Sequence, residues 1–311
     1  MVITDEIREA CAWVSERASS VRVMDQAIAT YADSLALAGS TSPAKTGTPV
    51  DGDNREGIAA FWLTLDAINF GSGWFPTLRK RAEPTGYRTI AAGIRRRFDE
   101  HGPWAARELA EIQTGELAIV LDQDPDHELL ALFAASLRDL GSRLDTDYGG
   151  SFTALIDDAG GSAVSLVTRL AGWECFADVS VYRGRKVPFL KRAQIAAADL
   201  HRAGVAPFDD LAQLTMFADN LVPHVLRLDG VLAFDPGLVQ RIDRGQLIEH
   251  GSAEEVEIRA GALQAVELIV AAAHAAGRPA ASAQVDELLW NRGQGTAYKS
   301  VPRHRSRTTA Y

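Results

Sequence analysis

Cysteine is scarce in this sequence. The 311 residues contain only Cys11 and Cys175, which lie far apart without a neighbouring His or Cys at metal-ligand spacing. A disulfide framework and a zinc site are therefore not indicated, and we expect a reducing, cytoplasmic location. The amino terminus is too acidic and interrupted for a signal peptide, and no apolar run reaches membrane-spanning length. Nothing resembles a glycine-rich phosphate loop or a serine nucleophile elbow.

Positive charge is also in deficit. The chain has 32 Lys and Arg against 41 Asp and Glu, which gives a formal net charge of -9. A general polyanion binder needs the opposite balance, so we expect no direct nucleic-acid partner. A small phosphorylated ligand remains compatible, because a few local basic residues can hold one phosphate in an acidic protein. We therefore expect a small-molecule substrate.

The remaining composition is typical of a soluble globular protein. It is 47% hydrophobic and 23% charged, and a chain of this length can bury a large core. We predict a single compact helical domain over residues 1–311. Two lobes that meet near residues 145–150 are the alternative organisation. We expect a monomer.

Helical periodicity dominates the chain. Apolar residues recur at roughly helical spacing over residues 5–38, and further helices are predicted from residue 58 onward. Residues 39–57 are rich in turn formers, which indicates a flexible loop or lid. Alternation around a Gly turn predicts a small β-hairpin near residues 176–189, at an edge and not within a large sheet. The expected fold class is therefore mainly α, a helical bundle with one small hairpin.

Residues 214–223 set one acid beside an aromatic ring. Their apolar members predict the end of a buried helix, and Pro223 suits the first turn of the next one. Asp219 would then lie in a helix-to-helix corner. Two interpretations are open: Asp219 is a catalytic carboxylate, or Asp219 or Asn220 caps the helix that runs through His224 to Gly230. The local pattern alone favours capping.

Four polar residues lie at unusual positions in predicted helices. Asp66 and Asn69 lie at the end of the apolar helix over residues 58–68, so they are either internal hydrogen-bond ties or site residues. Lys191 and Arg192 lie at a helix start, where cations oppose the helix dipole. Either an anionic ligand or simple solvent exposure would explain that pair.

The last third of the chain carries further candidates. Glu257, Arg259 and Glu267 fall among apolar positions of a long helix, so they belong either to a paired charge network or to an exposed flank. Asp286 and Trp290 are four residues apart and share a helix face. An acid beside a ring suits base recognition, although plain core packing would also explain the tryptophan. The basic segment 299–311, taken alone, predicts a loose tail.

Seven short sequence blocks occur along the chain in this order: LDAINF (65–70), GGSF (149–152), KRAQI (191–195), TMFAD (215–219), EVEIR (255–259), LW (289–290) and HRSR (304–307). Together they resemble the queuosine salvage protein family, the queuosine 5'-phosphate N-glycosylases, over roughly residues 58 to 311. The resemblance implies a mainly helical fold similar to helix-hairpin-helix DNA glycosylases. It also implies hydrolysis of queuosine 5'-phosphate to queuine and ribose 5-phosphate for queuine salvage and tRNA modification, with no metal or organic cofactor.

The resemblance also places roles on particular residues. It implies that Asp219 is the nucleophile or the stabiliser of the transition state, and that Phe217 lines the base pocket. It implies that Asp286, Trp290 and Asn291 hold the deazaguanine base. Asn291 replaces an acid of the family, which leaves fine base specificity open.

Further substrate contacts are expected nearby. Asp66 and Asn69 belong to the first shared block, although no histidine precedes this helix where some members place one that binds ligand. Four residues are candidates for the 5'-phosphate because of their charge and their position in shared blocks: Lys191, His304, Arg305 and Tyr311.

Other functions compete with this hypothesis. Asn291 motivates an N-glycosylase that acts on another purine-like nucleoside 5'-phosphate. A non-catalytic nucleotide-binding protein of the same fold would keep the pocket without the reaction. A DNA repair glycosylase is disfavoured by the net charge of -9.

Overall fold

The computed structural model describes residues 2–36, 55–80 and 85–311. Helices dominate it, so the mainly α fold class is confirmed, whereas the likeness to helix-hairpin-helix glycosylases stays a prediction. Most of the proposed lid over residues 39–57 lies outside the described residues, and its last three residues belong to the first helix after that gap. Among the described residues, no helix is both long and apolar enough to cross a membrane.

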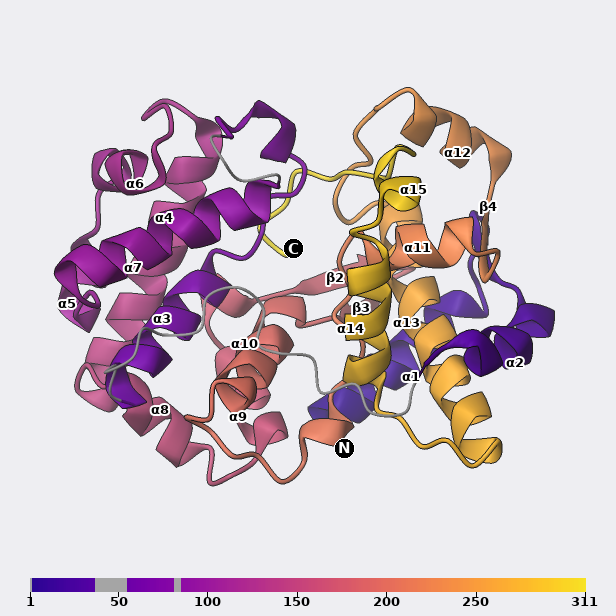
Figure 1. Cartoon of the computed structure of the whole chain (residues 1–311), viewed down its shortest axis with the longest axis horizontal. Helices are drawn as coiled ribbons and strands as arrows, with labels where there is room; N and C mark the ends of the chain where they lie inside the picture. Colours follow the sequence, from indigo (N-terminus) through magenta and orange to yellow (C-terminus); the bar gives the residue numbers. More distant parts are fainter. Residues whose placement is uncertain (1, 37–54, 81–84) are drawn as a thin grey trace.

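One half of the molecule follows the chain from α3 to α8 (Figure 1, left). Its longest helix, α7, packs against α3, α5, α6 and α8. Residues 145–148 form the end of α7, and residues 149–151 connect it to α8. The elements are α3 (Arg55–Ala67), η1 (Phe75–Thr77), α4 (Gly86–His101), α5 (Ala106–Glu111), α6 (Thr114–Leu121), α7 (Glu128–Tyr148) and α8 (Phe152–Asp158).

The other half is arranged around α13, which packs against α1, α2, α11 and α14 (Figure 1, right). It combines the first and last parts of the chain, so its core is built from residues far apart in sequence. The elements are α1 (Ile3–Ser15), β1 (Val21–Val23), α2 (Asp25–Ser34), α11 (Val222–Leu228), β4 (Leu232–Phe234), α12 (Pro236–Asp243), α13 (Ala253–Ala275), α14 (Ser282–Arg292) and α15 (Thr296–Lys299).

The continuous helix expected over residues 5–38 is wrong. Strand β1 separates α1 from α2 and pairs antiparallel with β4, with Val21 opposite Phe234 and Val23 opposite Leu232. The β-branched valines fit this pairing. Their apolar spacing was compatible with a helix, and the deciding partner strand lies about two hundred residues away in the chain.

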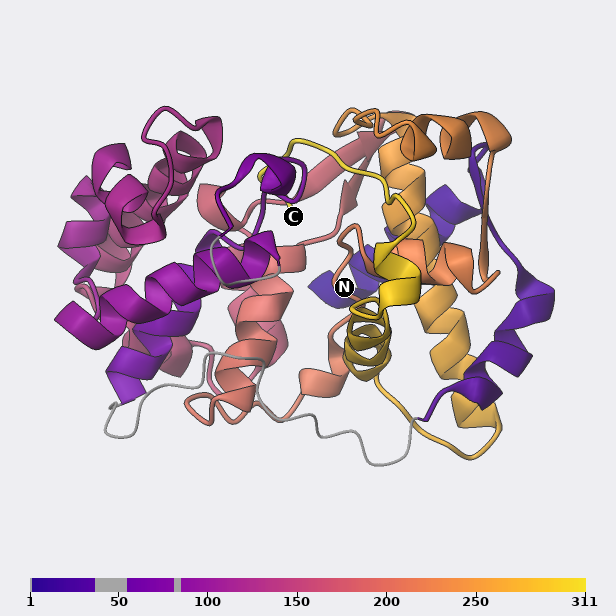
Figure 2. The same cartoon turned by 45° about the horizontal axis from the view of Figure 1, so that its top comes forward.

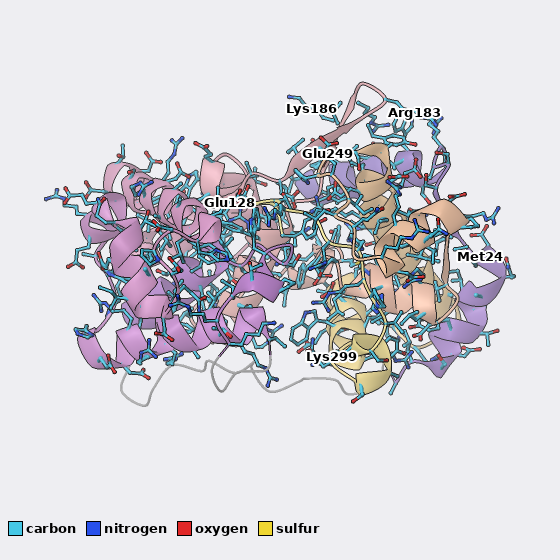
Figure 3. The ribbon with its side chains drawn as sticks, turned by 90° about the horizontal axis from the view of Figure 1, so that it is seen from above. Met24, Glu128, Arg183, Lys186, Glu249 and Lys299 are labelled. Carbon is cyan, nitrogen blue, oxygen red and sulfur yellow. The ribbon has the colours of Figure 1, made fainter. Side chains whose placement is uncertain are left out.

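The segment between the two halves contains the predicted hairpin, which is confirmed. Its strands pair antiparallel with Val179 opposite Pro188, and both turn residues, Arg183 and Gly184, have positive φ, as tight hairpin turns require. Figure 3 shows Arg183 and Lys186 at its projecting tip. The elements are α9 (Ala163–Leu170), η2 (Glu174–Phe176), β2 (Val179–Tyr182), β3 (Arg185–Pro188), α10 (Lys191–Arg202) and η3 (Leu211–Gln213).

Helix α13 carries buried charges, so the exposed-flank interpretation is wrong for Arg259 and Glu257. Arg259 is 0% exposed and donates to both oxygens of Asp178, at 2.9 and 2.7 Å. Glu257 does not join this pair; it accepts from the backbone N–H of Ser20 at 2.6 Å and from the Tyr182 hydroxyl at 2.8 Å. The charge network is therefore real for Arg259, whereas Glu257 ties backbone at the start of β1.

The C-terminal segment is not a loose tail. It crosses from α15 toward the other half (Figures 1 and 2). The backbone N–H of Gly71 donates to the backbone oxygen of Tyr311 at 3.0 Å, and that of Ile248 donates to the backbone oxygen of Arg305 at 2.9 Å. A Cβ on Gly73 would lie 2.3 Å from the backbone oxygen of Ser306. Glycine at 73 is therefore needed for the tail to pack here.

Gly73→Ala should destabilise the protein by about 1–3 kcal/mol, because the backbone of the tail must shift to accommodate the methyl group. Gly115→Ala is the matched control, since a Cβ there meets nothing within 4 Å, and alanine is the better helix former by about 0.5–1 kcal/mol. Urea unfolding compares the two variants with wild type. A Gly73→Ala protein as stable as the Gly115→Ala control would contradict this packing.

Acid should remove stability that Glu255 supplies. Burial alone would raise its pKa, but His250 and Arg259 outweigh burial and lower the pKa from 4.5 to about 2. Because the folded pKa is the lower one, ionised Glu255 stabilises the fold above pH 4.5, by about 3 kcal/mol. This contribution fades as the pH falls from 4.5 through 2.

Glu255→Gln isolates that contribution. The difference in unfolding free energy between wild type and the variant should be larger above pH 4.5 than below it, and shrink steadily as the pH falls from 4.5. The surface substitution Glu249→Gln serves as control and should change stability by less than about 0.5 kcal/mol. A difference for Glu255→Gln that is independent of pH would show that its charge does not stabilise the fold.

Candidate active site

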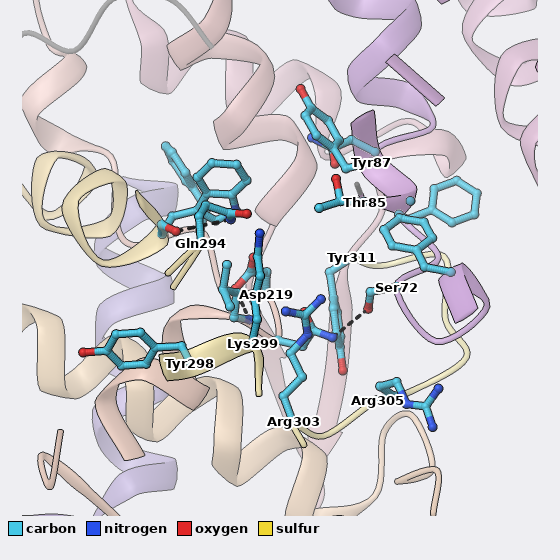
Figure 4. A pocket seen from close by; sticks show the side chains of 18 of the residues that line it. Ser72, Thr85, Tyr87, Asp219, Gln294, Tyr298, Lys299, Arg303, Arg305 and Tyr311 are labelled. Atoms are coloured by element: carbon cyan, nitrogen blue, oxygen red, sulfur yellow. Dashed lines mark hydrogen bonds between the residues drawn. The ribbon is translucent and has the colours of Figure 1, made fainter. Parts of the chain in front are cut away.

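A cavity of about 580 Å³ opens between the two halves (Figure 4). Its wall combines the loop after α3, the face of α10, the corner before α11, helices α14 and α15, and the C-terminal segment. The polar and aromatic residues that matter below are Asn69, Ser72, Thr85, Tyr87, Lys191, Asp199, Phe217, Asp219, Asn220, Asp286, Trp290, Lys299, Arg303, Arg305 and Tyr311.

The corner that carries Asp219 is extended, so the buried helix predicted to end at Phe217 is wrong. Only the short η3 precedes it, and residues 214–218 are buried. Their backbone is held by side chains from elsewhere. The amide of Gln194 accepts from Thr215 N–H at 2.8 Å, and Asp286 accepts from Phe217 N–H at 3.1 Å. Tertiary hydrogen bonds replace the helical ones and fix the corner.

Asp219 contacts both the start of α11 and the cavity. Its Oδ1 accepts from the backbone N–H groups of Leu221 at 2.8 Å and Val222 at 3.1 Å, so Asp219 caps backbone donors at the start of α11, although the N-cap position itself is Leu221 and not Asp219 or Asn220. The same half-buried side chain lines the cavity. The two interpretations are therefore compatible, because one oxygen caps α11 while the carboxylate stays at the cavity wall. The N–H groups hold its position and favour its charged form.

One side of the cavity combines two aromatic side chains with a carboxylate. Phe217, Asp286 and Trp290 all line it, and the i, i+4 spacing places the last two on one face of α14. Phe217 and Asp286 are 4% and 2% exposed, so a ligand would meet them largely shielded from water. Asn291 is exposed and is not part of the wall. The structure therefore brings together three of the four base-binding candidates.

The start of α10 is buried, so solvent exposure does not explain Lys191 and Arg192. Lys191 lines the cavity, and its Nζ donates to the backbone oxygen of Asn69 at 3.0 Å. Arg192 donates to the Ala67 oxygen at 2.5 Å behind the wall. Asn69 is part of the wall, whereas the fully buried Asp66 is not; Asn69 donates to it at 3.3 Å. Asp66 is therefore an internal tie.

The C-terminal segment contributes Arg305 and Tyr311 to the wall, as predicted. His304 is not on the wall; burial lowers its pKa to about 3, so the ring is neutral at pH 7. Its backbone oxygen accepts from Asn220 Nδ2 at 3.3 Å, and Asn220 also donates to Ser72 at 3.0 Å. His304 therefore supports the wall without touching the cavity.

Arg303 is a wall residue that the sequence analysis missed. Its side chain points toward the centre of the cavity beside Tyr311 (Figure 4). Burial lowers its pKa, while the charge of Asp219 acts in the opposite direction. Within the described parts of the chain, no hydrogen bond or ion pair is formed by its guanidinium. A shielded cation in that situation is suited to an anionic ligand. The acid-free stretch 299–311 was the available signal.

The charge of the wall differs from that of the whole protein. Its described side chains include five cations, Lys80, Lys191, Lys299, Arg303 and Arg305, against three carboxylates, Asp199, Asp219 and Asp286. The cavity is thus formally positive in a chain whose net charge is -9. Such a local excess attracts a small anion without making the protein a general polyanion binder.

Comparison with known proteins decides the family. The model of the queuosine salvage protein family matches residues 49–311. The chain belongs to this family. It is 38% identical over 307 residues to a queuosine 5'-phosphate N-glycosylase/hydrolase from Sphaerobacter thermophilus, covering 96% of this chain and 95% of the relative.

Two further queuosine 5'-phosphate N-glycosylase/hydrolases extend the comparison. The one from Nematostella vectensis is 32% identical over 284 residues, 80% of this chain and 81% of the relative. The one from Bos taurus is 28% identical over 284 residues, 84% and 83% of the two chains. The resemblance to the queuosine salvage protein family found in the sequence is therefore confirmed.

Proposed function

We propose that this chain hydrolyses the N-glycosidic bond of queuosine 5'-phosphate and releases queuine and ribose 5-phosphate. The names of its relatives describe that activity. The observation that carries the proposal is the carboxylate of Asp219, held on the cavity wall by two backbone N–H groups between the ring-binding side and the cations. No metal or organic cofactor is part of the proposal.

Asp219 acts on the charge that develops in the reaction. As the C1'–N bond breaks, its electron pair leaves with the base and positive charge builds on the ribose. A fixed carboxylate stabilises that transition state more than the neutral ground state. At roughly 4 Å and an effective dielectric near 20 the attraction is about 4 kcal/mol, or roughly a thousandfold in rate. Water supplies the oxygen to C1' and a proton to the base, whether or not Asp219 first bonds to C1'.

The base is held by stacking and by one acid. Phe217 and Trp290 offer ring faces, and such stacking contributes about 1–3 kcal/mol per base. The shielded Asp286 accepts hydrogen bonds from the N–H edge of the deazaguanine. A base without those donors would displace water from the acid without replacing its hydrogen bonds, which gives selectivity. Asn291 lies off the wall, so it provides no reason to prefer another purine-like nucleotide as substrate.

The phosphate is held by cations of the wall. Arg303 is the principal one, because its half-buried guanidinium faces the cavity and has no partner among the described residues. Lys191, Arg305 and Tyr311 remain candidate contacts, and Lys299 joins them. The pairing of phosphate with several donors also accounts for the positive wall.

Three broader expectations complete the proposal. The enzyme acts as a monomer, on a small molecule without direct binding to nucleic acid, and in the cytoplasm. The net charge of -9 and the scarcity of cysteine support the last two.

Asp219→Asn should lower the rate of queuine release by about a thousandfold or more, because the charge at the ribose is lost. Asparagine caps helices as well as aspartate does, so the melting temperature should stay within a few degrees of wild type. Chromatography follows queuine, and thermal unfolding checks the fold. Equal release by both proteins would mean that another group performs this role.

Arg303→Met should raise the KM for queuosine 5'-phosphate at least about tenfold, since a charge-assisted hydrogen bond to phosphate is lost. Cleavage of queuosine without its phosphate should change little. Arg307→Met is the matched control, because Arg307 lies on the same segment but is exposed and pairs with Glu128. Equal effects of Arg303→Met on both substrates would place the phosphate elsewhere.

A further inference from the structure

Helix α10 presents a third carboxylate to the cavity, which the roles described so far do not use. Lys191, Ile195 and Asp199 line the wall at a spacing of four residues, so they share one face of the helix. Eight residues of helix separate Lys191 from Asp199 by about 12 Å. The wall therefore runs from a cation at the start of α10 to an anion near its end.

The charge of Asp199 is only partly neutralised by the residues around it. It is 2% exposed and is bonded to Arg202 one turn further along. Arg202 also lies 3.8 Å from Glu287, so one cation serves two carboxylates. Burying an incompletely neutralised acid is costly unless a further positive or donor group meets it. Glu287 is not on the wall, so Asp199 is the member of this group that a ligand can reach.

Tyr87 lies at the same end of the cavity. Burial raises the pKa of its hydroxyl well above 10, and the charges of Asp199 and Asp66 act in the same direction. The hydroxyl therefore stays protonated, yet it forms no hydrogen bond with any residue in the described parts of the chain. Tyr87 and Thr85 lie at the opposite end of Figure 4 from Arg303 and Arg305, with Asp219 between them.

Arg303 and Arg305 thus lie at one end of the cavity, and Tyr87, whose hydroxyl feels the charge of Asp199, lies at the other. Queuine is a 7-deazaguanine whose position 7 carries a CH2 group, and this group bears a secondary alkylamine joined to a dihydroxycyclopentenyl ring. The amine is protonated at neutral pH. Queuosine 5'-phosphate therefore has an anionic phosphate on one side of its glycosidic bond and a cation on the other, which matches the order of charges on the wall.

We propose that Asp199 and Tyr87 form the subsite for the cationic side arm of the base, with Asp199 accepting from the ammonium group and Tyr87 bonding to the diol. This inference rests on the proposed function and adds the residues that distinguish queuosine from nucleotides without the arm. Asp286 then reads the guanine-like edge, and Asp199 reads the substituent.

Asp199→Asn tests the subsite, because asparagine can still accept from Arg202 but carries no charge. The kcat/KM for queuosine 5'-phosphate should fall at least about tenfold. The inhibition constant of 7-deazaguanosine 5'-phosphate, which lacks the arm, should change less than about twofold. Glu287→Gln removes the other carboxylate beside Arg202 and should leave both values near wild type.

The outcomes separate the two proposals. Equal weakening toward both compounds would assign Asp199 a structural role, and no weakening would leave the arm elsewhere; either result overturns the subsite while cleavage by wild type upholds the reaction. If wild type does not cleave queuosine 5'-phosphate, the proposed function fails and the subsite falls with it. Should Asp199→Asn not fold, Tyr87→Phe carries the same comparison, with a selective loss expected and an unselective or absent loss contradicting the subsite.

Discussion

The fully buried guanidinium of Arg259 holds together the parts that build the cavity. It pairs with both oxygens of Asp178, and its Nε donates at 3.0 Å to the carbonyl of Ala218, the residue before Asp219. Asp178 also accepts from the backbone N–H of Lys191 at 3.0 Å, and the guanidinium lies 4.5 Å from the Tyr311 ring centre. Because a buried charge must keep its partners, the corner, α10 and the tail are fixed relative to one another.

This anchoring explains how Asp219, the proposed catalytic acid, is held in place in a non-helical corner. The entropy cost of ordering Asp219 is offset during folding by its hydrogen bonds at the start of α11 and by the hydrogen bonds to the backbone of Thr215 and Phe217. Arg303 and Arg305 lie on one side of it and Tyr87 on the other, and Phe217 and Trp290 line the same cavity. A substrate with separated charges can therefore be oriented before the bond breaks, which is the main way a rigid site lowers a barrier.

Local sequence patterns predicted the features that depend on interactions between residues close together in the chain. Helix α10 and the hairpin follow from spacing and turn chemistry, and the pair Asp286 and Trp290 follows from a four-residue repeat. Strand β1 could not be predicted in this way, because its partner β4 is distant in sequence. Arg303 and Tyr87 have no periodic signal and gain their positions from tertiary packing. The helical spacing of Lys191 and Asp199 is visible in the sequence, but only the structure shows that both line the cavity.

The central claim is that substrate lies along the cavity with its C1' atom beside Asp219. A crystal structure of the Asp219→Asn protein with intact queuosine 5'-phosphate tests this most directly. We predict C1' next to residue 219, the base between Phe217 and Trp290, and the phosphate at Arg303. Ligand bound with C1' remote from residue 219, or with the phosphate at the Asp199 end, would contradict the account.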